Sequence, residues 1–145
     1  MEKFIKSAVF IFAITAGLKA VAATGEQGLL GAKDPLFSFI TTRQLMVLTA
    51  VLEIGLIILL TSPIQAIHKV LLIGTLATTF AFYRIVLLLI GYRGPCACLG
   101  SLTAWMGLTD SQVMVLTWGL ALYLLFGSYI CLFKDVFRQT QIVAK

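Results

Sequence analysis

Residues 44–60 read QLMVLTAVLEIGLIILL, an apolar run that a single charged residue, Glu53, interrupts. A run of this length can cross the ~30 Å hydrocarbon core of a bilayer as an α-helix. Runs of the same kind recur along the chain and predict transmembrane helices at about 4–23, 43–61, 67–91 and 112–134. With 60% hydrophobic and only 12% charged residues, the chain has more apolar surface than a small soluble domain can bury. We therefore predict an all-α integral membrane protein, a four-helix transmembrane bundle that forms one domain over residues 1–145.

Helix-breaking residues separate these runs. Asp34-Pro35 interrupts the first connection, Ser62-Pro63 ends the second helix, and Gly94-Pro95 follows the third helix. The connections are too short to hold a further domain, and none has the Ser/Gly-rich composition of a flexible linker.

The segment before the last apolar run has signals of its own. Residues 101–108 combine apolar positions with a tryptophan, which predicts a short interfacial helix between the third and fourth transmembrane helices. Thr109 and Gln112 have the spacing of a capping box. We therefore expect the last transmembrane helix to start near Gln112.

The first apolar run has a second interpretation. The basic residues Lys3 and Lys6, an apolar core and the small residues Ala20-Val21-Ala22 are also typical of a cleaved secretory signal peptide. Lys19 lies where a signal peptide is normally uncharged, which argues for a retained helix. We expect residues 4–23 to remain as a membrane anchor, with cleavage after residue 22 as the alternative.

The basic residues indicate an orientation in the membrane. A net charge of +5 would suggest nucleic acid as the partner of a soluble protein, but here the basic residues stand at the ends of apolar runs, so we expect no nucleic-acid partner. One side of the bundle would carry Lys3, Lys6, Lys69, Lys134, Arg138 and Lys145, and the other side Lys33, Arg43 and Arg93. The positive-inside rule then predicts a multi-pass protein of a bacterial inner membrane with both termini in the cytoplasm.

In that orientation Cys96-Ala97-Cys98 would face the periplasm, where thiols are oxidised. Two cysteines one residue apart can act as a redox-active dithiol, form a structural disulfide, or simply pack, and a small strained ring of this kind tends to be labile. A metal site needs about four ligands, and the remaining candidates, Cys131 and His68, lie near the opposite side of the bundle. We therefore predict no metal site within the chain.

Lys19, Glu53 and Arg84 are ionisable residues within the predicted spans, where burial is costly and such residues usually pair. Counting along the helices places all three in the half of the bilayer nearer Cys96 and Cys98. One interpretation is a polar pocket below the cysteines that favours a thiolate or holds an anionic or quinone-like ligand. The other is a charge-paired bundle core, with Lys19 extending toward the interface.

Several of these elements occur together in a known family. Ala16-Gly17-Leu18-Lys19, Asp34-Pro35, Glu53 and Cys96-Ala97-Cys98-Leu99-Gly100 resemble the DoxX-like and MauE-like membrane proteins over most of the chain. The resemblance implies a four-helix bundle associated with periplasmic redox work, because MauE-like proteins are linked to disulfide formation and DoxX-like proteins to quinone-linked sulfur oxidation. Family members often have Gly and Phe where this chain has Ala97 and Leu99, and Ala97 restricts the turn more than glycine would.

From these observations we expect a redox-associated membrane protein that handles thiol–disulfide or quinone-linked electron transfer through Cys96 and Cys98. Cys98 would be the attacking thiol, and a separate periplasmic redox protein would be the partner. A non-catalytic accessory subunit of a larger membrane complex is the main alternative. A small-ligand transporter that uses the charged pocket is a third. The sequence leaves open whether the chain is itself a thiol–disulfide oxidoreductase.

Overall fold

The computed structural model describes residues 1–24, 31, 33–92 and 109–143. The helices in these residues are α1 (Glu2–Thr24), α2 (Thr42–Thr61), α3 (Ala66–Leu89) and α5 (Asp110–Val143). All four are long and apolar enough to cross a membrane. The described residues contain no β-strand, only an isolated bridge between Lys33 and Thr41. The predicted all-α class is confirmed, and the chain is a multi-pass membrane protein. The predicted interfacial helix at 101–108 lies outside the described residues.

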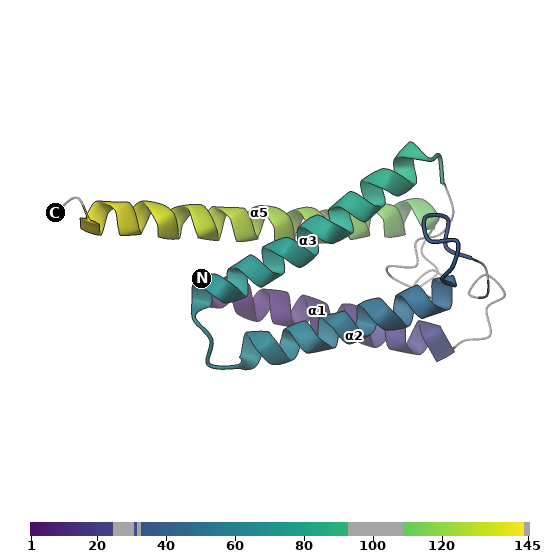
Figure 1. Ribbon diagram of the computed structural model, residues 1–145, viewed down its shortest axis with the longest axis horizontal. Coiled ribbons are helices and arrows are strands. Elements are labelled where there is room, and N and C mark those ends of the chain that lie inside the picture. The colour runs from purple at the N-terminus through teal and green to yellow at the C-terminus, as the bar shows by residue number, and fades with distance from the viewer. Residues whose placement is uncertain (25–30, 32, 93–108, 144–145) are drawn as a thin grey trace.

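The helices run up and down in sequence order (Figure 1). Met1 and residues 62–65 lie at one end of the bundle, which we call the terminal end. Residues 33–41, the end of α3 and the start of α5 lie at the other, which we call the loop end. Both connections that hold polar sequence, before α2 and before α5, are therefore attached at the loop end.

Side chains and backbone groups fix the helix ends at the loop end. The Thr41 hydroxyl accepts the Gln44 N–H at 3.3 Å and the Gln44 side chain accepts the Thr41 N–H at 3.0 Å, which is a complete capping box for α2. Before α5, the Gln112 side chain accepts the Thr109 N–H at 3.0 Å. The Thr109 hydroxyl instead pairs with Ser111 at 3.1 Å, so only half of the predicted capping box forms there.

The end of α3 requires a glycine. Gly91 has a φ of 74°, the left-handed region that side chains disfavour. The Tyr92 N–H bonds to the Leu87 carbonyl at 3.0 Å, and the Gly91 N–H bonds to the Leu88 carbonyl at 3.0 Å. This pair of bonds is a Schellman motif, which turns the chain off the helix axis and satisfies carbonyls that the helix end would leave unpaired.

Helix α5 is longer than the sequence predicted. We expected it to end near residue 134, but it continues to Val143. The residues after 133 include no glycine or proline, and Lys, Arg and Gln are good helix formers, so nothing in the sequence stops the helix where its apolar run ends. At 1.5 Å per residue the helix is about 51 Å long, and its C-terminal part projects past the other helices (Figure 1).

The four helices pack as two close pairs, α1 with α2 and α3 with α5. Small residues permit the second pair to approach: a Cβ at Gly74 would lie 3.2 Å from the Cβ of the fully buried Ser128. One apolar core joins both pairs and is formed by Ile5, Ala8, Phe12, Leu56, Leu60, Val70, Ile73, Ala77 and Leu124. Outside this core most large apolar side chains remain exposed, as expected of helices that face lipid.

Gly127 lets the start of α1 rest on α5. A Cβ at Gly127 would collide with the Phe4 ring, which also lies 5.9 Å, centroid to centroid, from the Tyr123 ring. We predict that the free energy of unfolding of Gly127→Ala lies about 1–3 kcal/mol below that of Gly119→Ala, because both gain the helix preference of alanine but only at Gly127 must the Phe4 ring move away from Tyr123.

Gly119→Ala is the matched control, since nothing lies within 4 Å of a Cβ there and the substitution favours the helix. Unfolding of the detergent-solubilised protein, followed by circular dichroism, measures both. Equal effects at the two glycines would contradict the predicted contact.

Candidate functional site

A cavity of about 360 Å³ lies among the four helices. Its walls are mainly apolar, with Phe12 from α1, Leu76 from α3 and Leu120 from α5 among them. Leu36 and Phe37, from the segment before α2, close part of the loop end. The charged residues that line it are Lys19, Glu53 and Arg84. A small volume with apolar walls and a few convergent polar groups is the usual form of a site for a small molecule.

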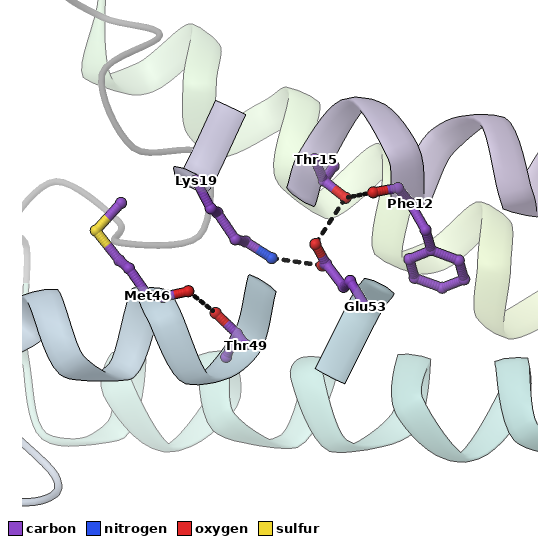
Figure 2. A network of polar contacts seen from close by, with 6 residues as sticks. All are labelled: Phe12, Thr15, Lys19, Met46, Thr49 and Glu53. Atoms are coloured by element: carbon purple, nitrogen blue, oxygen red, sulfur yellow. Dashed lines mark hydrogen bonds and ion pairs between the residues drawn. The ribbon is translucent and has the colours of Figure 1, made fainter. Parts of the chain in front are cut away.

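Lys19 and Glu53 form a buried ion pair between α1 and α2 (Figure 2). Their side chains are only 4% and 2% exposed. The Thr15 hydroxyl also donates to Glu53, with 3.1 Å between Oγ1 and Oε2, so each carboxylate oxygen has a donor. The Lys19 Nζ lies 5.1 Å from the centroid of the Phe80 ring, which adds a cation–π contact from α3.

Helix direction explains why these two residues meet. In an α-helix the Cα–Cβ bond tilts toward the N-terminus. Lys19 is about 7 Å from the loop end of α1 along the axis and Glu53 is about 16 Å from the loop end of α2. Because the helices are antiparallel, the Lys19 side chain leans away from the loop end and the Glu53 side chain leans toward it. These two inclinations bring the Lys19 ammonium and the Glu53 carboxylate to nearly the same depth in the bundle.

Arg84 lines the same cavity but has a different environment. It lies one turn after Phe80 on α3, about 7 Å from the loop end of that helix, and is half-buried. It forms no hydrogen bond or ion pair within the part of the chain that the structure describes. Lys19 is already balanced by Glu53, so the described residues that line the cavity carry one excess positive charge.

Asp34 and Tyr83 fix the segment that closes the loop end. Asp34 is buried, and its Oδ1 accepts the N–H groups of Leu36 and Phe37 at 2.9 Å and 3.0 Å. The Tyr83 hydroxyl donates to its Oδ2 at 2.7 Å, and the Phe37 ring stacks on the Tyr83 ring with centroids 6.5 Å apart. Residues 33–41 are thereby attached to α3.

The structure thus pairs Lys19 with Glu53 and brings Arg84 to the same cavity without pairing it to either. Cys96 and Cys98 lie outside the described residues. Cys131 is half-buried against the apolar core.

Sequence reasoning missed the contributions of Thr15, Phe80 and Asp34. Asp34 precedes proline, a pattern typical of side chains that accept backbone N–H groups two residues on, and this was the available signal. Thr15 lies one turn before Lys19, which places it on the same helix face.

The arrangement can hold an apolar molecule that presents a hydrogen-bond acceptor or a negative charge to Arg84. The threonines Thr15 and Thr49 use their hydroxyls within the protein, Thr49 by donating to the Met46 carbonyl at 3.0 Å (Figure 2). No family model, curated protein sequence or solved structure matches this chain.

Removing one partner of the buried pair should be far more damaging than removing both. Lys19→Met leaves an unpaired carboxylate in the core and Glu53→Leu leaves an unpaired ammonium, so we expect each to lower the free energy of unfolding by about 3–5 kcal/mol. The double variant replaces the pair with apolar side chains and should lose much less.

A double-mutant cycle from unfolding in detergent measures the coupling. Lys6→Met is a control, because Lys6 pairs with Glu2 in an exposed position and its loss should have little effect. Additive effects of the Lys19 and Glu53 substitutions would contradict the pairing.

Proposed function

We propose that the chain is a redox-associated membrane protein that passes thiol–disulfide or reducing equivalents between Cys96 and Cys98 and a periplasmic partner, with a quinone-like molecule held in the cavity. The observation that carries this proposal is the cavity itself, with its apolar walls and with Arg84, which has no partner among the described residues. The resemblance of the cysteine element to DoxX-like and MauE-like proteins supports the same reading.

The chain's topology supports a link between the cysteines and the cavity. The connection that contains Cys96 and Cys98 joins the end of α3 to the start of α5, and both of these helix ends lie at the loop end (Figure 1). Arg84, Tyr83 and Leu36 line the cavity near that same end. Cys96 follows Tyr92 by four residues in sequence.

The donor set fits a quinone-like group. The apolar walls suit a ring and an alkyl chain, and Arg84 can donate hydrogen bonds to a carbonyl oxygen. When bound, such a molecule would accept the two electrons and two protons that a dithiol releases on closing to a disulfide. The Lys19 and Glu53 pair would keep the α1 and α2 wall in a fixed geometry.

The distribution of charge supports the proposed orientation. Lys3 and Lys6 at the start of α1 and Lys69 at the start of α3 belong to the terminal end, whereas Lys33 and Arg43, before and at the start of α2, belong to the loop end. In a bacterial inner membrane, the positive-inside rule favours an orientation with both termini in the cytoplasm and the loop end at the periplasmic face. Helix α1 would remain as an anchor, because its residues Ile5, Ala8 and Phe12 are part of the core.

Trapping a mixed disulfide tests the redox proposal. In Cys96→Ser cells, Cys98 can attack a partner but has no neighbouring thiol to release it, so we expect a partner adduct on a non-reducing gel that a reductant removes. Cys98→Ser should trap less, because Cys98 is the proposed attacking thiol.

Cys131→Ser is the matched control and should behave as the wild type, since that thiol packs against the core. The double Cys96→Ser, Cys98→Ser variant should trap nothing. Absence of a reducible adduct in both single variants, at normal protein level, would overturn the proposal.

A second candidate function, that of a non-catalytic accessory subunit, is favoured by one observation. Among the described residues, helix α5 is the least buried of the four spans. A larger membrane partner could cover its exposed side chains, which include Phe126, Tyr129 and Phe133.

Purification in mild detergent separates the two functions. A structural subunit should be recovered in stoichiometric complex, and Phe126→Ala with Phe133→Ala should release it. Phe10→Ala is the matched control, because Phe10 is equally exposed but on α1. Recovery of the wild-type chain alone would contradict the accessory role.

A further inference from the structure

We infer that the cavity binds a single-chain amphiphile with an anionic head, which enters from the lipid between α2 and α3 and pairs its head with Arg84. A fatty acid and an alkylated quinone with an ionised ring hydroxyl share this chemistry. The inference deepens the proposed function. It rests on that function only where the bound amphiphile is a quinone, because the binding of an anionic amphiphile follows from the geometry described below.

The cavity opens between α2 and α3. Some of its lining residues face outward as well as inward: Leu48 and Leu52 on α2 are 50% and 51% exposed, and Phe82 on α3 is 67% exposed. Thr79, also exposed, lies one turn before Tyr83 on the same helix. In a bilayer these exposed side chains face acyl chains, so the opening leads to the lipid.

The packing of the helices in pairs separates α2 from α3. Helices α2 and α3 make few contacts with each other, since each pairs mainly with another helix. They diverge from their 62–65 connection toward the loop end (Figure 1). The two helices are therefore farther apart toward the end of the bundle that holds Arg84.

The loop end is covered on the side of residues 33–41. Leu36 and Phe37 line the cavity there, and the Asp34 and Tyr83 hydrogen bond attaches them to α3. A molecule that reached the cavity over this segment would have to break a buried carboxylate's bonds to two backbone N–H groups and a phenol. Entry through the apolar opening between α2 and α3 breaks none of these bonds.

Charge determines the head group. Glu53 neutralises Lys19, so these two residues have little attraction for an ion (Figure 2). Arg84 has no partner among the described residues and sits where the surrounding medium is apolar. An unpaired charge is costly there and is relieved by an anion that forms hydrogen bonds with it. The volume of about 360 Å³ falls within the range of about 300–1,000 Å³ typical of small-molecule sites.

Photolabelling tests the inference. The full chain is placed in nanodiscs of neutral phosphatidylcholine and irradiated with dodecanoic acid that carries a diazirine on its chain. We expect peptide mass spectrometry to find the label on cavity-lining residues of α2 and α3. Unlabelled dodecanoate should compete, and dodecanol, with the same chain and no charge, should compete roughly tenfold less well.

Variants identify the head-group partner and the route. Arg84→Gln should reduce labelling roughly tenfold, and Arg84→Lys should retain part of it. Lys69→Gln is the matched control, because it removes the same charge from the terminal end of α3 and should leave labelling unchanged. Thr79→Trp, which adds a bulky side chain to an exposed position of the cavity lining, should also reduce labelling. Circular dichroism of each variant shows that it is folded.

The outcomes separate this inference from the redox proposal. Labelling that is equal in wild type and Arg84→Gln, or equal competition by dodecanol, would overturn the inference. The Cys96→Ser, Cys98→Ser double variant should bind dodecanoate as the wild type does. If dodecanoate binds but no partner protein is trapped, only the redox proposal is overturned. If a partner protein is trapped but dodecanoate does not bind, only this inference is overturned. An alkylated 2-hydroxy-1,4-naphthoquinone and its neutral 2-methoxy analogue can each be tested as competitors of the labelling. Competition by the first alone would show that the site also accepts anionic quinones.

Discussion

The buried pair of Lys19 and Glu53 is the interaction on which the rest of the arrangement depends. Two charges inside a membrane span are tolerated only when each is matched, and here Thr15 and the Phe80 ring complete the match. The pair joins α1 to α2 at a fixed rotation and register. In this arrangement Leu48 and Leu52 on α2 remain exposed, and Arg84 on α3 has no partner among the residues that the structure describes.

Apolar runs were sufficient to predict the four spans, because lipid requires every backbone polar group to be satisfied within a helix. The end of α5 was not predicted from the apolar run. The residues from Lys134 on are less hydrophobic, but they still favour a helix. Depth along each helix predicted Lys19, Glu53 and Arg84 in the half of the bundle nearer the loop end. Lys19 and Arg84 lie in that half, whereas Glu53 lies near the middle of α2. Whether any two of them touch depends on helix rotation and on side-chain tilt. That is why the sequence could not separate the Lys19 and Glu53 pair from Arg84.

The closure at the loop end was predictable only in part. Asp34-Pro35 indicated a turn, and the structure adds that its carboxylate also binds Tyr83, 49 residues away. A contact of that separation depends on how α3 lies against the segment before α2, which no local pattern encodes. Asp34 holds both its own turn and the distant helix α3, and this contact covers part of the loop end. Access to the cavity between α2 and α3 therefore differs from access over residues 33–41 because of tertiary structure.

Helix α5 connects the cavity with the terminal end of the bundle. It is one continuous rod of 34 residues, about 51 Å long, and Leu120 and Leu124 in its first half line the cavity. The cavity wall near the loop end and the part of the chain that projects past the other helices at the terminal end are therefore segments of one continuous helix.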